Sequence, residues 1–265
     1  FLMDLGLKDK VVIVGGASKG IGKAAALGFA REGAKVAISA RNPDQLNATA
    51  EEIRQETGAE ILAVPGDLSQ AEATERVVDE TVARFGTVHV LVANTGGPPM
   101  GGFDAMDDAA WESAFALNFL STVRLIRKVL PHMKQQNWGR LLSVMSMSVK
   151  EPIDGLILSN GVRPAVVGMA KTLSREIGQY NITINTVLPG LILTDRLRGG
   201  IAARAERAGK SFDETLEASA ATIPLRRVGD PQEMGNVIVF LASEAASYVN
   251  GVSIQVDGGV VRGLL

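Results

Sequence analysis

Short runs of apolar, often β-branched residues alternate with longer amphipathic segments along the whole chain, and this alternation constrains the fold most. The runs are Lys10–Gly16, Ala34–Ala40, Glu60–Asp67, Val88–Gly96, Gly139–Ser146, Ile182–Gly190 and Gly251–Gly259. Their apolar residues are continuous rather than alternating, which indicates strands covered on both faces. Segments with helical spacing, such as Gly20–Arg31 and Pro43–Thr57, lie between them. The sequence therefore predicts a doubly wound, parallel α/β sheet of about seven strands with helices on both faces.

Length and composition bound the domain and its partners. The chain has 265 residues, of which 46% are hydrophobic, so we expect one domain over residues 1–265 with an ample core. The net charge of -2 gives no electrostatic attraction to nucleic acid or to an anionic membrane, and neither is expected as a partner. The absence of cysteine excludes disulfides, thiolate catalysis and zinc–sulfur sites. We predict no metal site.

The sequence gives no sign of export or membrane insertion. The stretch FLMDLGLKDKVVIV lacks the basic region, apolar run and small-residue cleavage site of a signal peptide. No apolar run is long enough to cross a bilayer. We therefore expect a cytoplasmic protein and attribute the glycosylation sequons that begin at Asn47 and Asn181 to chance.

One segment, residues 194–229, is too long for a simple connection and has a helical pattern of its own. Segments of this kind often cover active sites, so we predict a helical substrate lid here. Its arginines could meet an acidic substrate, but interleaved acidic residues favour a solvated helix face instead. The arginines are Arg196, Arg198, Arg204 and Arg207, and the acids are Asp195, Glu206, Asp213 and Glu214.

A glycine-rich turn, GGASKGIG, follows the first predicted strand and opens the first helix. Free backbone N–H groups at the start of a helix bind phosphate, and glycines allow the tight turn and the close approach of the backbone. The same turn could merely pack the helix onto the strand, but its place in the first strand–helix unit favours nucleotide binding. The predicted pyrophosphate contacts are Gly16, Ser18, Lys19, Gly20, Ile21 and Gly22.

The spacing of Gly16, Gly20 and Gly22 resembles the fingerprint of the short-chain dehydrogenase/reductase family, and the similarity extends over essentially the whole chain. The resemblance implies a Rossmann-type fold, a nicotinamide cofactor and a small-molecule carbonyl or alcohol substrate. Further matching cofactor contacts are Asp67 and Leu68 at the adenine, Asn94 and Gly96 in ANTG, and Pro189, Gly190, Ile192 and Thr194 at the nicotinamide. Members of the family commonly form homotetramers or homodimers, and the apolar C-terminal VVRGLL suits such a subunit contact.

Two positions near the expected adenine side depart from the family pattern. Gly15 stands where the family usually has Thr, and Ala93 replaces the first Asn of its N-N-A-G motif. These differences affect the affinity and geometry of the cofactor site but leave the glycine turn itself in place.

The end of the second strand bears on the choice of nicotinamide. An acidic residue there would accept hydrogen bonds from a ribose 2′-hydroxyl and repel a 2′-phosphate, but this chain has Ala40 followed by Arg41. Lys19 would face the same pocket. Two cations without a carboxylate suit a phosphorylated ribose, because Arg pairs with phosphate through two hydrogen bonds. We predict NADP(H) over NAD(H); the alternative is that both are plain surface cations.

The active site that the resemblance implies is only partly present. Asn118 and Ser146 match the family's asparagine and serine, whereas Ser159 and Arg163 stand where the family has its proton-transferring Tyr and, four residues on, its Lys. Positions four apart share a helix face, so the two side chains can touch. A serine hydroxyl is shorter and far less acidic than a phenol of pKa about 10, and Arg stays protonated. We predict Asn118, Ser146, Ser159 and Arg163 as catalytic residues, with Ser146 and Arg163 polarising the substrate oxygen directly or through water.

No other tyrosine or histidine is well placed to replace the missing acid. Tyr180 and Tyr248 lie away from the site on the family's fold, and packed or solvated roles are favoured for His89 and His132. The remaining candidates lie in the loop after the fifth strand: Ser148, Lys150, Glu151 and Asp154. A Lys or Glu there could act as the acid if burial moved its pKa toward neutrality, but a charged loop surface is favoured.

We therefore predict an NADP(H)-linked carbonyl/alcohol oxidoreductase, similar to 3-oxoacyl-acyl-carrier-protein reductases but without the Tyr-x-x-x-Lys motif. Two alternatives stay open. The first is a cofactor-binding regulator or scaffold without turnover. The second is a lyase or dehalogenase on the same fold, although halohydrin dehalogenases keep the Tyr and lose the glycine turn, the reverse of this chain.

Overall fold

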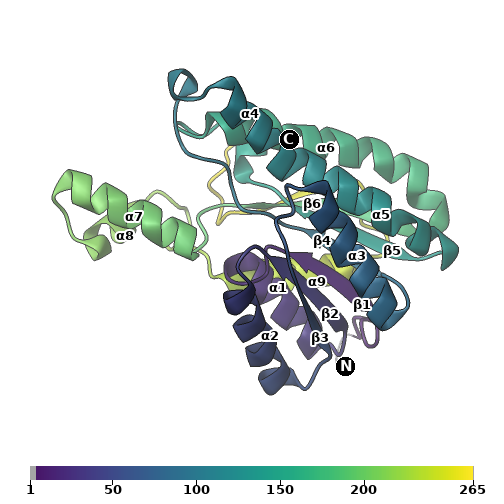
Figure 1. The fold of residues 1–265 in the computed structure, drawn as a ribbon. Coiled ribbons are helices and arrows are strands. Elements are labelled where there is room, and N and C mark those ends of the chain that lie inside the picture. Colours follow the sequence, from purple (N-terminus) through teal and green to yellow (C-terminus); the bar gives the residue numbers. More distant parts are fainter. Residues whose placement is uncertain (1–3, 265) are drawn as a thin grey trace.

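Seven parallel strands form one sheet in the computed structural model, which describes residues 4–264 (Figure 1). In chain order they are β1 (Val11–Gly15), β2 (Lys35–Ala40), β3 (Ile61–Pro65), β4 (Val90–Ala93), β5 (Gly139–Val144), β6 (Ile182–Pro189) and β7 (Ser253–Val256). Their order across the sheet is β3-β2-β1-β4-β5-β6-β7, and every neighbouring pair is parallel. The predicted doubly wound sheet is confirmed. Phe1–Met3 and Leu265, at the ends of the predicted domain, lie outside the described residues.

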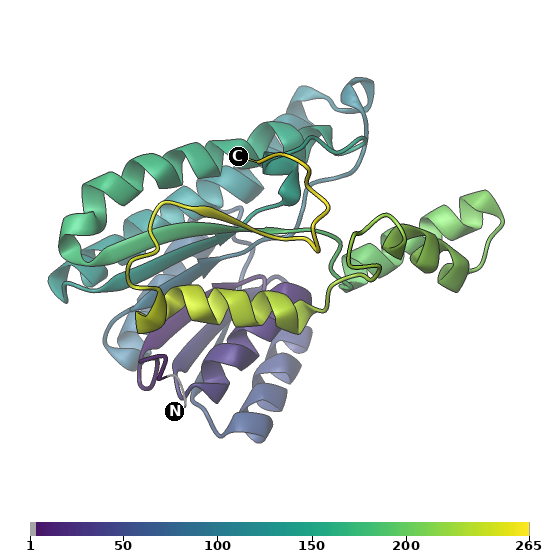
Figure 2. The same ribbon diagram turned by 180° about the vertical axis from the view of Figure 1, so that it is seen from behind.

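Helices cover both faces of the sheet (Figures 1 and 2). One face carries α1 (Gly20–Arg31), α2 (Pro43–Thr57) and α9 (Pro231–Ala242), and the other carries α3 (Ala71–Phe85), α5 (Ser121–Gln135) and α6 (Ile157–Ile177). Successive side chains of a strand point to opposite faces. Val12 and Val14 accordingly pack in the cluster under α1 and α9, and Ile13 packs in the cluster under α3 and α5. Two cores on one sheet explain why its strands are continuously apolar.

The strand order reverses in the middle of the sheet. From β1 the chain builds β2 and β3 on one side, then returns to place β4 next to β1 and continues to β7 on the other side. Val12 pairs with Val90 and Val14 with Val92 across this junction. The connections that leave β1 and β4 run to opposite faces, which opens a crevice at the carboxyl ends of these strands, the usual ligand-binding place in such sheets.

A wide helical turn, which the sequence analysis did not anticipate, joins two helices above this crevice. A π-helical turn, Ala116–Leu120, links α4 (Asp108–Phe115) to α5. Such turns are rare, and they occur often at functional sites because they change the direction of a side chain within a helix. Asn118 lies at the centre of this turn and is buried.

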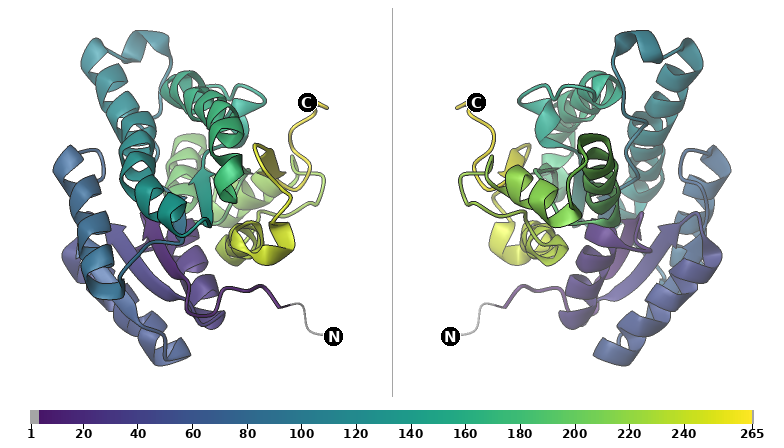
Figure 3. Two further views of the ribbon diagram at one scale, coloured as in Figure 1. Left: turned by 90° about the vertical axis from the view of Figure 1, so that its right-hand side faces the viewer. Right: turned by 90° about the vertical axis from the view of Figure 1, so that its left-hand side faces the viewer.

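Residues 194–229 contain a pair of helices that projects from the body of the molecule (Figures 1 and 2), and Figure 3 looks along the direction of this projection. α7 (Asp195–Ala208) and α8 (Phe212–Ala220) pack on each other, with Ile201 and Ala205 buried on α7. Backbone atoms close the base of the pair: the Leu193 N–H donates to the Gly229 carbonyl at 2.8 Å, and the Gly229 N–H donates to the Leu191 carbonyl at 2.9 Å.

The long helix α6 carries a proline within its length. It begins at Ile157, and Pro164 lies two turns inside it, where it lacks the N–H that would bond to the carbonyl of Asn160. The Asn160 side chain binds both the N–H and the carbonyl of Ile153, which ties the start of α6 to the loop before it. Within residues 4–264, no helix combines the length and apolar character needed to span a membrane.

Candidate active site at the carboxyl edge of the sheet

The glycine turn between β1 and α1 has a backbone that requires glycine. Gly16 and Gly20 have φ values of 57° and 58°, in the left-handed region that side chains disfavour. A Cβ on Gly22 would lie 2.3 Å from the carbonyl oxygen of Gly16, so a side chain has no room there. Lys19, the residue before α1, supplies no side-chain cap to the helix. The first N–H groups of α1 thus face the crevice without a side-chain acceptor, as a bound phosphate requires.

Asn94, at the end of β4, holds the glycine turn against the neighbouring strand. Its Nδ2 donates to the carbonyl of Gly15 at 3.0 Å and to that of Gly16 at 3.4 Å. A Cβ on Gly15 would lie 2.6 Å from the Asn94 carbonyl oxygen. Glycine at position 15, where the family usually has Thr, is therefore required by this close approach of two strand ends.

The two cations predicted for a ribose phosphate have different surroundings. Arg41 follows β2, is exposed, and makes no hydrogen bond or ion pair within residues 4–264. Lys19 forms an ion pair with Asp195 of α7, with 3.1 Å between Nζ and Oδ2 and both side chains more than half exposed. An exposed pair of this kind contributes little to stability, so Lys19 can exchange Asp195 for another anion.

The predicted adenine and nicotinamide segments lie on either side of the glycine turn. Asp67 accepts from the Ser69 N–H at 3.0 Å, and Leu68 is buried, with its side chain near Gly15. In the segment after β6, Thr194 caps α7 through the Leu197 N–H, and its methyl group would lie 3.2 Å from a Cβ on Gly20. The remaining residues predicted there and in the turn are Ser18, Ile21, Gly96, Pro189, Gly190 and Ile192, of which Ile192 is buried.

Three serines form a line after β5. Ser146 Oγ accepts a hydrogen bond from the Ser148 N–H at 3.1 Å, and the hydroxyls of Ser148 and Ser159 are 3.2 Å apart. Because Ser146 Oγ accepts from a backbone N–H, its own proton is free to be donated elsewhere. From the sequence, Ser148 is one of four loop candidates for the missing acid, and in the structure its hydroxyl connects Ser159 to the loop of Ser146.

Arg163 is buried beside this line, and its charge has no acidic partner within residues 4–264. Its Nη1 donates to the carbonyls of Val144 at 3.1 Å and Met145 at 2.7 Å, the two residues before Ser146. Its Nε is buried without a hydrogen-bond partner within the described chain. Burial, followed by the charge of Arg196, lowers the pKa of Arg163 to about 10. Arg163 therefore remains charged at neutral pH and cannot act as a proton shuttle.

Asn118 completes the site from the opposite helix. Its Nδ2 donates to the hydroxyl of Thr95 at 2.9 Å and to the carbonyl of Gly96 at 3.1 Å, just past the end of β4. Its Oδ1 is buried and has no partner within residues 4–264. A buried acceptor without a donor is costly, so this oxygen is suited to a donor from a ligand or an ordered water.

Arg196 is exposed, as predicted for the arginines of this segment, but it also makes a contact that the sequence did not reveal. A solvated helix face was favoured for all four arginines of the segment, but Arg196 reaches back from α7 to donate to the Gly97 carbonyl at 2.8 Å and the Pro98 carbonyl at 2.9 Å. Arg198 and Arg207 are exposed, as predicted. Arg196 alternates with acidic neighbours in the sequence, and only the position of α7 reveals its contact with the loop after β4.

The other groups considered as acids lie elsewhere or are exposed. Nδ1 of His89 accepts from the Val11 N–H at 2.9 Å, at the amino edge of the sheet, so this histidine is packed rather than catalytic. Lys150 and Asp154 are exposed, and Glu151 accepts from the Arg262 N–H at 3.2 Å. Burial therefore does not prepare any of these three loop side chains for proton transfer.

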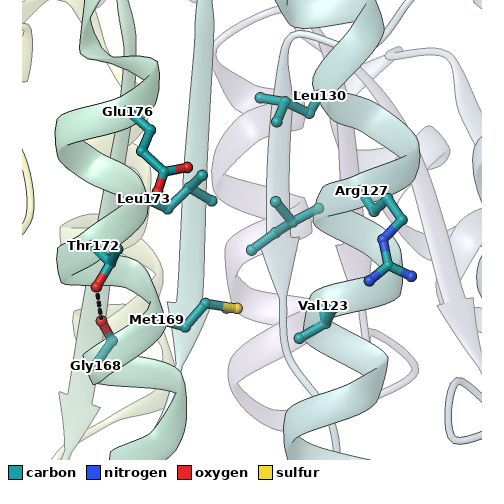
Figure 4. A pocket seen from close by; sticks show the side chains of 9 residues that line it. Val123, Arg127, Leu130, Gly168, Met169, Thr172, Leu173 and Glu176 are labelled. Carbon is teal, nitrogen blue, oxygen red and sulfur yellow. Dashed lines mark hydrogen bonds between the residues drawn. The ribbon is translucent and has the colours of Figure 1, made fainter.

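A groove of about 450 Å³ lies between α5 and α6 (Figure 4). Apolar residues such as Val123, Leu130 and Met169 line it, together with Arg127 and Glu176. None of its lining residues belongs to the glycine turn or to the serine line, so this groove is separate from the candidate active site.

The geometry agrees with comparisons across known proteins. A family model described as enoyl-(acyl carrier protein) reductase matches residues 16–261. The 7alpha-hydroxysteroid dehydrogenase of Escherichia coli strain K12 is 33% identical over 98% of this chain and 98% of its own length. The uncharacterized oxidoreductase YvrD of Bacillus subtilis strain 168 is 32% identical over 99% of this chain and all of its own. The chain belongs to the short-chain dehydrogenase/reductase family.

Solved structures extend the similarity to three dimensions. L-sorbose reductase from Gluconobacter frateurii, in complex with NADPH and L-sorbose, matches with a TM-score of 0.96 and 32% identity over 99% of this chain and 100% of that chain. YwfH, an NADPH-dependent reductase involved in bacilysin biosynthesis, matches with a TM-score of 0.92 and 28% identity over 97% and 100%. The Rossmann-type fold is thus shared over the full length of these relatives.

Proposed function

We propose that this protein is an NADP(H)-linked carbonyl/alcohol oxidoreductase with a non-standard active site, in which serine and arginine replace the usual tyrosine and lysine. The observation that carries the proposal is that two sets of predicted site residues lie at the same edge of the sheet. The glycine turn lies at the end of β1, and the serine line with Arg163 lies at the end of β5. Two full-length relatives support it: L-sorbose reductase, in complex with NADPH and L-sorbose, and YwfH, an NADPH-dependent reductase.

The residues of the crevice fit a dinucleotide phosphate. The glycine turn and the start of α1 would hold the pyrophosphate, because a Cβ at Gly22 would close this cradle. Arg41, free of protein partners within residues 4–264, would pair with the 2′-phosphate. When bound, NADPH would supply the hydride.

The chain's own residues would bind and polarise the substrate. Ser146 donates its hydroxyl proton in a hydrogen bond to the carbonyl oxygen, because its Oγ already accepts from the Ser148 N–H. The charge of Arg163 lies beside the same residues and stabilises negative charge that develops on that oxygen. Since a serine hydroxyl is a weak acid, the proton that completes the alcohol comes from water, and Ser159 and Ser148 orient this water.

A cofactor-binding protein without turnover is the second candidate. One observation favours it: the only hydrogen bonds of Arg163 within the described chain go to backbone carbonyls, so this residue has a structural role whether or not chemistry occurs. Tight NADPH binding without oxidation on any carbonyl compound would support this candidate over the first.

The test is NADPH oxidation across a broad panel of carbonyl compounds. Ser146→Ala and Arg163→Ala are expected to lower kcat/KM by about a hundred- to a thousandfold each, the usual effect of losing one donor to a developing oxyanion. Thr172→Ala, at an exposed position of α6 that lines the separate groove between α5 and α6, is the control and is expected to leave the rate unchanged. Native-like rates in both site variants would exclude the proposed mechanism.

Restoring the family's residues provides a second test. Ser159→Tyr combined with Arg163→Lys is expected to rebuild a phenol and its ammonium beside Ser146, and a positioned general acid raises rates by roughly a hundred- to ten-thousandfold. The single variant Ser159→Tyr gains much less, because arginine would stand in place of lysine. A double variant slower than the native enzyme would mean that the short serine leaves room for substrate or water.

We also propose that α7 and α8 cover the substrate, and that the protein assembles as a homodimer or homotetramer. The ion pair between Lys19 and Asp195 and the contacts of Arg196 with the loop after β4 support the first proposal. The proposed oligomer rests on the dimers and tetramers that are common in the family and on the apolar C-terminal segment. Light scattering coupled to size-exclusion chromatography measures the mass directly, and a monomer would contradict it.

A further inference from the structure

The candidate active site contains positive charge that no acidic side chain balances. Arg163 and Arg196 form no ion pair within residues 4–264. Asp195, the acidic residue next to Arg196, is paired with Lys19. Glu151, in the loop after β5, accepts from a backbone N–H of the C-terminal segment. In the part of the chain that the structure describes, the two guanidinium groups donate only to neutral backbone carbonyls.

These two arginines bind the chain near the carboxyl ends of two neighbouring strands, Arg163 at β5 and Arg196 after β4. Arg163 binds the carbonyls of the two residues that precede Ser146, and Arg196 binds the carbonyls of Gly97 and Pro98. The neighbouring carbonyl, that of Gly96, accepts from Asn118. Arg163 and Arg196 are near enough that the charge of Arg196 contributes to lowering the pKa of Arg163.

Both guanidinium groups retain unused donors. Both side-chain hydrogen bonds of Arg163 come from its Nη1. Within the described chain, its Nε is buried without a partner and its Nη2 makes no hydrogen bond. Arg196 uses one bond from each of its Nη atoms, and a guanidinium carries more N–H groups than these. A nicotinamide ribose would satisfy some donors with its hydroxyls, but hydroxyls carry no charge. Arg163 is buried, so its unpaired charge is costly and an anion bound nearby would offset that cost, whereas Arg196 is exposed.

We infer that the substrate is a carbonyl compound that carries a carboxylate beside the reacting carbonyl, a 2-oxo acid, and that Arg196 binds this carboxylate next to the buried charge of Arg163. The inference rests on the proposed function, since it names the substrate class of that site. Arginine suits a carboxylate because its planar fork donates two parallel hydrogen bonds. Ser146 then holds the carbonyl oxygen, and Arg196 fixes the carboxylate toward the loop after β4.

The test compares charged carboxylates with their uncharged methyl esters. A series of 2-oxo acids with side chains of increasing length is assayed by NADPH oxidation beside the corresponding methyl esters. The acids are expected to have values of kcat/KM about ten- to a hundredfold higher than their esters, the size of one charge-assisted hydrogen bond. Arg196→Gln should abolish this preference, and Arg196→Lys should retain part of it.

Arg204→Gln is the matched control, because Arg204 is an exposed arginine of the same helix that binds only Ser219 within residues 4–264. It should leave the preference for acids intact. Equal rates on acids and esters in the native protein would overturn the inference but leave the oxidoreductase proposal standing. If Arg196→Gln binds NADPH more weakly but keeps the preference for acids, the Arg196 guanidinium binds the cofactor and not the substrate. This result would also overturn the inference.

Binding separates this inference from the proposed reaction. Calorimetric titration of the NADP⁺-loaded protein with oxamate, an unreactive analogue of a 2-oxo acid, and with the longer acids, is expected to show saturable binding that Arg196→Gln weakens at least tenfold. If these acids bind but no carbonyl compound is reduced, the anion site stands and the oxidoreductase proposal fails. If no acid binds or reacts, the inference is wrong.

Discussion

Two glycines in the turn after β1 exclude side chains for different physical reasons. Gly20 has a φ of 58°, which an L-amino acid adopts only with strain, whereas Gly22 lies so close to the Gly16 carbonyl that a Cβ does not fit at any φ. A substitution at Gly22 would disturb the packing of α1 on β1 together with ligand binding. Gly20 is therefore the better position at which to test the cradle.

Gly20→Ala is expected to weaken NADPH binding while the protein stays folded. The backbone strain costs about 1–2 kcal/mol, and the new Cβ lies 3.2 Å from the Thr194 methyl group at the mouth of the crevice. Gly58→Ala is the matched control: Gly58 ends α2 with a φ of 71°, and no atom lies within 4 Å of an added Cβ. Both variants should lose similar stability in thermal melts, but only Gly20→Ala should raise the dissociation constant measured by calorimetry.

Arg41→Ala is expected to remove most of a preference for NADPH over NADH. The native preference should be about 1–3 kcal/mol in binding free energy, as for charge-assisted hydrogen bonds to one phosphate. Lys19 accounts for a smaller part of the preference for NADPH, since it already has Asp195 as a partner. Arg31→Ala, which removes an exposed arginine paired with Glu56, serves as the control. Equal dissociation constants of the two nucleotides for the native protein would refute the assignment.

At the scale of elements, His89 holds the amino end of β4 against β1, and it does so in the neutral form. Burial, followed by the charge of Lys10, lowers the pKa of His89 from its ordinary 6.5 to about 4. The unfolded chain thus takes up a proton between pH 6.5 and about 4, where the folded protein does not. Folded-state stability is fully present above pH 6.5 and is lost as the pH falls through this window.

His89→Gln should therefore have a flatter stability profile than the native protein in that window. The glutamine carbonyl can still accept from the Val11 N–H, which keeps the contact between the strands. Urea unfolding near pH 7 and near pH 4.5 should show a difference on the order of 1 kcal/mol in the pH effect between the two proteins, given that the imidazole is only partly buried. Parallel profiles of stability against pH would show that His89 does not contribute to the pH dependence of folding.

Local signals in the sequence were enough to predict several elements in full. α2 begins and ends as predicted because Asn42 caps it through the Gln45 N–H, Pro43 occupies its first turn, and Gly58 ends it in the left-handed region. The continuous apolar runs likewise predicted the parallel sheet. These features depend on neighbours in the chain, so pattern and propensity suffice for them.

Other features depend on contacts between distant segments, and the sequence could not reveal them. The π-helical turn around Asn118 has no compositional mark, since its stability comes from the packing of α4 and of the turn itself against the start of α6. The contact of Arg196 with Gly97 joins residues 99 positions apart in the chain. The roles predicted for Ser159 and Arg163 stay predictions until the assays above are made.

For the whole molecule, α7 and α8 form a unit of their own, because they pack on each other and not on the sheet (Figures 1 and 2). Lys19 and Arg196 connect α7 to the glycine turn and to the loop after β4. A cofactor bound between the glycine turn and the loop after β4 would therefore contact the first turn of α7.

NADPH is therefore expected to slow amide hydrogen exchange in Asp195–Ala208 by several-fold or more, with little change in α5. Lys19→Ala and Arg196→Gln together should reduce this protection, since they remove both side-chain links to the body. Exchange followed by mass spectrometry resolves the two helices. Protection limited to the glycine turn would show that α7 does not respond to the cofactor.

The base of this helix pair is closed by backbone atoms of Leu191, Leu193 and Gly229. Backbone hydrogen bonds do not depend on which side chains lie between them. We therefore expect that the segment between Thr194 and Gly229 can be exchanged for that of a relative without disturbing the strand pairing or the two cores, provided that Thr194, a predicted nicotinamide contact, is kept. Transplanting it would transfer the choice of substrate from one member of the family to another while the scaffold and its nucleotide site stay the same.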